Sequence, residues 1–124
     1  MKQSDDKHRK ELANLLKARF GTISDGFRFS FESTAGLDAI DLHALLQGNK
    51  DIDKHLQHAA DRASTEGRKP LLFWKRSRRG WLVFVWSEEI AGLTFHATIR
   101  YGNWTVIGLQ DFLDLSDEFF YPVA

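Results

Sequence analysis

The chain contains no cysteine, and that absence removes several kinds of chemistry at once. Disulfide bonds, zinc sites built on thiolates and a cysteine nucleophile are all excluded. A chain without cysteine suits a reducing compartment, so we expect a cytoplasmic protein.

Proline and long apolar runs are also scarce. The chain has only two prolines in 124 residues and no linker rich in serine and glycine, so we expect one domain over residues 1–124. The longest strongly apolar run, from Trp81 to Trp86, is far shorter than the ~20 residues that a membrane-spanning helix needs. The first ten residues are polar and charged, unlike a signal peptide, so we expect no membrane association.

Net charge is the third quantity that is lacking, because 17 basic residues balance 17 acidic ones. A protein without net charge does not attract DNA through its overall field. A nucleic-acid-binding function would therefore need a local positive patch.

The pattern of apolar residues predicts a mixed α/β (α+β) fold. Helical spacing of Leu12, Leu16 and Phe20 predicts a helix over residues 5–19, and a second stripe predicts a helix over 52–64. Shorter helical segments are expected at 37–46 and 109–115.

Strands are expected over residues 26–34, 71–75, 81–86, 93–101 and 104–107. In the first of them Phe27, Phe29 and Phe31 share one face, and Glu32 lies on the other. The crossover from this strand to residues 71–75 should be parallel and right-handed, and the later strands should form antiparallel hairpins. We therefore expect a central mixed β-sheet of about five strands with flanking helices.

A cluster of basic residues surrounds the strand at 71–75. Basic side chains interleaved with aromatic rings suit phosphate contact and base stacking, although such a run is often only a solvated loop. The residues predicted to bind nucleic acid are Lys69, Lys75, Arg76, Arg78, Arg79 and Trp81.

Residues 67–83 resemble a segment of the phage and prophage members of the PD-(D/E)xK endonuclease superfamily, which are related to archaeal Holliday-junction resolvases. The shared features are Lys69-Pro70, an apolar strand, Lys75-Arg76, a basic turn and Trp81. Residues 109–113 resemble the family's usual ending, residues 56–60 its glutamine-bearing helix, and residues 31–34 its Glu-x-Lys motif.

The resemblance implies a restriction-endonuclease-like fold and hydrolysis of branched DNA with Mg²⁺ or Mn²⁺. It places Asp25 and Glu32 as metal ligands, with Glu11, Gln57 and Lys75 as further catalytic residues. Two departures from the family pattern leave open whether the protein is an active enzyme. Thr34 occupies the lysine position, and Asp25 is closer to Glu32 than is usual in the family. Lys75, Lys50 or Lys54 could take the place of the missing lysine.

The alternative function is a catalytically dead nuclease-fold module that binds DNA or a host protein, such as a phage-encoded inhibitor. The acidic aromatic tail favours a protein partner, and a homodimer through an exposed strand or through that tail is compatible with the sequence. The tail consists of Asp114, Asp117, Glu118, Phe119, Phe120 and Tyr121.

Each candidate residue also has a plainer interpretation. Glu32 could be a strand residue paired with Arg28, and Asp25 could simply belong to a turn. Glu11 and Gln57 could be surface residues of their helices. The five histidines show no convincing metal pattern, so a zinc site is not expected.

Overall fold

The computed structural model describes residues 2–23, 26–34, 47–48, 50–76 and 80–121. Its first half contains α1 (Lys2–Phe20), β1 (Phe29–Thr34), α3 (Lys50–Glu66) and β2 (Lys69–Arg76). Its second half contains β3 (Gly80–Trp86), a 3-10 turn η1 (Ser87–Ile90), β4 (Ile99–Tyr101), β5 (Trp104–Gly108), α4 (Leu109–Leu113) and α5 (Asp117–Phe120). The predicted helix at 37–46 and Asp25 lie outside these described residues.

The strands form one five-stranded sheet in the order β1-β2-β3-β5-β4. β1 pairs parallel to β2, with Phe31 opposite Leu71, and the remaining pairs are antiparallel. The predicted mixed sheet with flanking helices is therefore confirmed. The restriction-endonuclease-like arrangement of that sheet stays a prediction.

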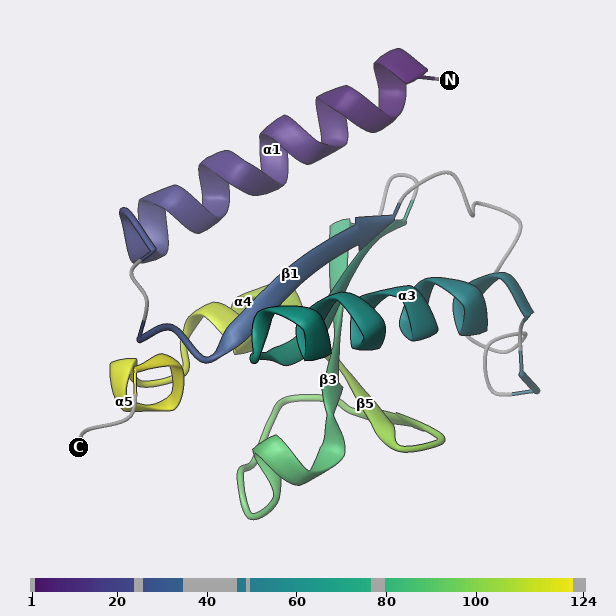
Figure 1. Cartoon of the computed structure of the whole chain (residues 1–124). Coiled ribbons are helices and arrows are strands. Elements are labelled where there is room, and N and C mark those ends of the chain that lie inside the picture. Colours follow the sequence, from purple (N-terminus) through teal and green to yellow (C-terminus); the bar gives the residue numbers. More distant parts are fainter. Residues whose placement is uncertain (1, 24–25, 35–46, 49, 77–79, 122–124) are drawn as a thin grey trace.

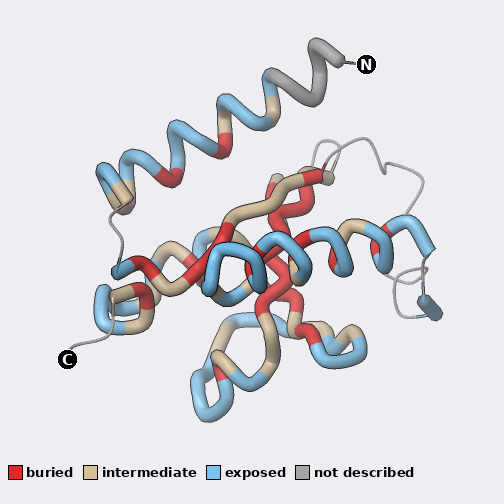
Figure 2. The backbone as a smooth tube through the Cα atoms, in the orientation of Figure 1, coloured by how far each residue is buried: buried red, intermediate tan, exposed pale blue. Residues whose placement is uncertain are grey.

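Helices cover both faces of this sheet (Figure 1). On one face α3 packs over Leu72, Trp74 and Phe84, which are fully buried. On the other face the core is built from α1, α4 and α5 against side chains such as Phe29 and Phe73. Because β2 and β3 are buried on both faces, their sequences are nearly continuous apolar runs. Figure 2 shows the buried segments concentrated along these strands.

The C-terminal tail belongs to the core, which its acidic sequence does not suggest. Phe120 is fully buried, and its ring stacks on that of Phe27 with centroids 5.9 Å apart. The backbone N–H of Arg28 donates to the carbonyl of Phe120 at 3.0 Å, and the Arg28 side chain donates to the carbonyl of Phe119. The aromatic residues that were expected to face a protein partner are thus largely used inside the molecule.

The strand expected over residues 93–101 is wrong in its first six positions, because only Ile99–Tyr101 is extended in the sheet. The neighbouring strand β5 has five residues and pairs with β4 from Ile99 onward. Residues 93–98 alternate in polarity but have no strand beside them, and Leu93 is exposed. Alternation alone predicts a strand only where a neighbour can pair with it.

Candidate nucleic-acid interface and the predicted metal ligands

Glu32 faces α3 and is already paired with a cation. Its side chain is 18% exposed, and its Oε2 lies 3.1 Å from Nη1 of Arg62. The imidazole Nε2 of His58 lies 3.9 Å from the same oxygen. Arg62 also pairs with Glu66, and hydrogen bonds to Glu32 and Glu66 raise the pKa of its guanidinium. The carboxylate of Glu32 is therefore neutralised from within the chain.

The other polar residues of β1 are engaged by the same flank of α3. Thr34, which occupies the predicted lysine position, is buried, and its Oγ1 lies 3.2 Å from Nε2 of His55. A hydrogen bond from Ser30 lowers the pKa of Glu66, with the neighbouring guanidinium of Arg62 adding to the effect. Ser30, Glu32 and Thr34 of β1 thus each have a partner side chain on α3.

Among the described residues, the side chains around Glu32 are not those of a magnesium site. Mg²⁺ prefers oxygen ligands and carboxylates, whereas the nearest side chains here are a guanidinium and an imidazole. In the part of the chain that the structure describes, no three His, Asp or Glu residues are grouped so that they could hold a metal ion. Asp25, the predicted second ligand, lies outside that part.

Glu11 meets Lys75 and Trp81 beneath α1. Its Oε1 accepts hydrogen bonds from Nζ of Lys75 at 3.2 Å and from Nε1 of Trp81 at 3.3 Å. Partial burial acts to raise the pKa of Glu11, but the two hydrogen bonds together with the nearby charges of Lys75 and His8 outweigh it and hold the pKa below its usual value. This small cluster connects the first half of α1 to the hairpin formed by β2 and β3.

The predicted catalytic residues do not converge. Successive strand residues point to opposite faces, and Phe31 packs against Phe20 and Phe73 on the α1 face, so Glu32 points to the α3 face. Glu11 and Lys75 lie on the α1 face, across the sheet from Glu32. The structure therefore does not bring Glu32 together with Glu11 and Lys75.

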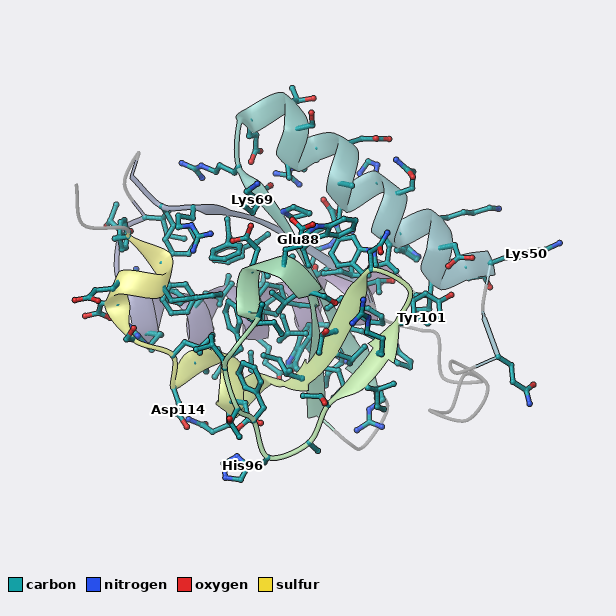
Figure 3. All side chains as sticks on the ribbon, turned by 90° about the horizontal axis from the view of Figure 1, so that it is seen from below. Lys50, Lys69, Glu88, His96, Tyr101 and Asp114 are labelled. Carbon is teal, nitrogen blue, oxygen red and sulfur yellow. The ribbon has the colours of Figure 1, made fainter. Side chains whose placement is uncertain are left out.

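Two further residues also lie apart from their predicted partners. Gln57 donates to Asp61 and borders a pocket beside Tyr101 on the opposite flank of α3 from Arg62 and Glu32. Figure 3 shows Tyr101 beneath this helix. Arg28 pairs with Glu89 and not with Glu32.

The basic cluster is divided between two ends of the sheet. Lys75 and Arg76 end β2, next to the loop of residues 77–79, whose arginines Arg78 and Arg79 lie outside the described residues. Lys69 begins the same strand, about 23 Å away at the usual rise per residue, and lies 3.7 Å from a carboxylate oxygen of Glu89. Lys69 therefore does not join the others in one patch.

Trp81 offers little ring surface for a base. It is 7% exposed, and the ring of His8 meets it edge-on with centroids 6.4 Å apart. The predicted stacking role does not fit this burial. Its position is informative in another way, because it brings residues 7–10 of α1 next to the end of the hairpin.

Positive and negative charges are unevenly distributed along the chain. This distribution can be read from the sequence, but the total net charge of zero does not show it. Residues 1–80 hold sixteen of the 17 basic residues and eleven of the 17 acidic ones, whereas residues 81–124 hold one basic and six acidic residues. The start of α1 and the acidic helix α5 lie at opposite ends of the molecule (Figure 1). Lys7 and Lys10 of α1 are exposed at the basic end, beside the hairpin that carries Lys75 and Arg76.

Comparison of the chain with protein-family models, with curated proteins and with solved structures found no match. Among the described residues, no helix has both the length and the apolar character to cross a bilayer.

Proposed function

We propose that this protein binds DNA through its basic end and does so as a nuclease-like module that does not cut. The interface consists of the exposed face of α1 at Lys7 and Lys10 together with the hairpin end at Lys75 and Arg76. The loop arginines Arg78 and Arg79 belong to the same proposal. A cytoplasmic location is part of it.

One observation carries the proposal: two basic segments that are far apart in the sequence meet in space. The contacts of Glu11 with Lys75 and Trp81 join α1 to the hairpin. Of the acidic residues in the last third of the chain, those of η1 follow the far end of β3, and those of α5 lie at the opposite end of the molecule from the start of α1 (Figure 1). Clustered lysines and arginines release counterions from a phosphate backbone, and that release drives sequence-independent DNA binding.

The absence of cutting is argued from the partners of Glu32. A nuclease of the resembled kind needs carboxylates around one hard cation. Here Glu32 is paired with Arg62, and Glu11 is paired with Lys75 on the other face of the sheet. Hydrolysis by this protein would require a different arrangement of these side chains.

The test is fluorescence anisotropy with a labelled 20-base-pair duplex and a labelled four-way junction over a range of salt concentrations. In the double variant Lys7→Glu/Lys10→Glu we expect the affinity to fall about tenfold or more and the salt slope to fall by about 2, because each lost phosphate contact removes roughly one unit.

The matched control is Lys54→Glu/Arg100→Glu, which reverses two exposed cations on α3 and β4. It should bind like the wild type, within about twofold. Equal losses in both double variants would show only a response to net charge and would refute a localised interface.

A further inference from the structure

The strand β1 has one edge that no described strand pairs with. It lies at the end of the sheet order and bonds only to β2. The N–H of Lys69 donates to the carbonyl of Arg28. The alternation of a parallel ladder then directs the backbone groups of Phe29, Phe31 and Ser33 away from β2. Phe29 is fully buried, so the accessible part of this edge is at Phe31 and Ser33.

Within the described residues, β1 carries few of the features that protect an edge strand from pairing with another chain. Natural proteins shield edge strands with lysine, proline, bulges or very short length. β1 has six residues, Phe-Ser-Phe-Glu-Ser-Thr, with neither lysine nor proline. The opposite edge strand, β4, has only three residues and includes Arg100.

An apolar groove of about 490 Å³ runs between α1 and β1. Leu12, Leu16 and Ile23 line it, together with Phe31 of β1. This volume lies within the range of about 300–1,000 Å³ that is common for ligand clefts. The groove therefore provides an apolar surface beside the unpaired backbone of β1.

Three residues of α1, Arg9, Ala13 and Lys17, line the groove at successive helical turns. All three are exposed, and no acidic residue lines the groove among the described residues. The electrostatic character of the groove is thus positive, with a small side chain midway between the two cations.

The spacing of these cations matches an extended chain. Arg9 and Lys17 are eight residues apart on a helix, which corresponds to about 12 Å. Residues i and i+4 of a β-strand point to the same side and are about 13 Å apart. Two acidic side chains at i and i+4 would therefore reach both cations, and the residue at i+2 would lie over Ala13.

We propose that β1 and this groove bind an extended, acidic segment of a partner protein, which adds to the sheet as a sixth strand. The segment carries the pattern acidic-x-apolar-x-acidic. Backbone hydrogen bonds to Phe31 and Ser33 supply affinity, while Arg9 and Lys17 select the charge and the register. This surface adjoins the DNA interface proposed above, because Arg9 lies between Lys7 and Lys10 on α1, but it does not depend on that proposal.

The probe is a fluorescent peptide, acetyl-Thr-Glu-Thr-Val-Thr-Glu-Thr-amide, measured by anisotropy. Two comparison peptides are its lysine twin, with both glutamates replaced, and a peptide of the same composition with the glutamates two residues apart. We expect the first peptide to bind at least about tenfold more tightly than either comparison peptide, because only it places two carboxylates at the spacing of the cations. Equal binding of the three peptides, or no binding of the first, would overturn the proposal.

Two variants test the two halves of the surface separately. Arg9→Glu/Lys17→Glu should abolish the preference for the glutamate peptide, and Ser33→Pro should weaken all peptide binding by removing an outward N–H. The control Lys54→Glu/Arg100→Glu should leave peptide binding unchanged. If circular dichroism shows that Ser33→Pro does not fold, the variant Arg9→Glu/Lys17→Glu still decides between the proposal and its failure.

Light scattering after size-exclusion chromatography separates this proposal from self-association. At about 0.2 M salt we expect a monomer for the free wild-type protein, because contacts between exposed charges are screened there. A dimer that Arg9→Glu/Lys17→Glu or Ser33→Pro converts to a monomer would mean that a second copy occupies the edge, and the partner proposal would fail.

Discussion

The polar residues of β1 show that a carboxylate on the polar face of a strand can be paired within the protein and so not be available to bind a ligand. Ser30, Glu32 and Thr34 each have a counterpart on α3, namely Glu66, Arg62 and His55. From sequence, the alternation placed Glu32 on the polar face correctly, since that depends only on the strand period. Its partner could not be predicted, because the rotation of α3 over the sheet is set by packing of Ile52, Leu56 and Ala59.

The variant Glu32→Ala therefore tests whether the carboxylate of Glu32 has a structural or a catalytic role. We expect the wild type to leave duplexes and four-way junctions intact with Mg²⁺ or Mn²⁺, and Glu32→Ala to bind DNA within about twofold of the wild type. The lost pair with the half-exposed Arg62 should lower the free energy of unfolding by about 1 kcal/mol or less. Gel electrophoresis and urea titration give the two readouts. Metal-dependent cleavage that disappears in Glu32→Ala would contradict the non-cutting proposal.

His96 provides a pH-dependent contact at the surface. Its Nδ1 lies 2.5 Å from Oδ1 of Asp111, and this hydrogen bond and the negative charge raise the pKa of the imidazole above its usual value of about 6.5. Figure 3 shows His96 projecting from the side of the molecule that carries Asp114. Because the folded-state pKa is raised, the contact stabilises the fold fully below pH ~6.5 and is lost as pH rises through the folded value.

An NMR titration of the His96 ring protons checks this expectation. The midpoint should lie above that of an unstructured histidine, and Asp111→Asn should return it to about 6.5. A midpoint of His96 that Asp111→Asn does not change would refute the pairing.

At the scale of elements, the short helix α5 closes the core under β1. The ring of Phe120 contacts those of Phe27 and Phe112, with centroids 5.9 Å and 5.2 Å apart. From sequence the residues after Ser116 were interpreted as a tail, because a four-residue helix has too few positions to show a periodicity. The sheet itself was predictable, since short, nearly continuous apolar runs and a crossover connection leave few alternatives.

Truncating the ring of Phe120 should therefore destabilise the whole fold. Phe120→Ala should lower the free energy of unfolding by about 3–5 kcal/mol, as expected for a fully buried phenylalanine. Its exposed neighbour Glu118 provides the control, because Glu118→Ala should change stability by about 0.5 kcal/mol or less. Urea unfolding followed by tryptophan fluorescence measures both. A change below about 1 kcal/mol in Phe120→Ala would show that α5 is not part of the core.

For the whole molecule, zero net charge conceals an uneven distribution. Residues 81–124 hold six acidic residues and one basic residue, and the isoelectric point is about 7.0. Near pH 7 the molecules do not repel one another through net charge, while the basic end of one can approach the acidic end of another. Such contacts between exposed charges are screened beyond about 10 Å at 0.1 M salt.

Light scattering at pH 7 should accordingly show association at about 10 mM salt that disappears near 0.2 M. The variant Lys7→Glu/Lys10→Glu should remain dispersed at low salt, because it removes part of the positive end and gives the chain a net negative charge. Association that grows with added salt would instead indicate apolar contacts and would contradict the charge-based explanation.

The contact between β1 and the end of the chain has a consequence for synthesis. Arg19 donates to the carbonyls of Leu113 and Leu115, and the backbone N–H of Arg28 donates to the carbonyl of Phe120. Residues 19–28 therefore depend on residues 113–120 for these hydrogen bonds. While a ribosome is still elongating the polypeptide, β1 lacks β2 and the rings of Phe27 and Phe29 lack their cover from α5. Productive folding must therefore wait until α5 has been synthesised, and a chain that stops before Phe119 and Phe120 would leave the rings of Phe27 and Phe29 without these partners.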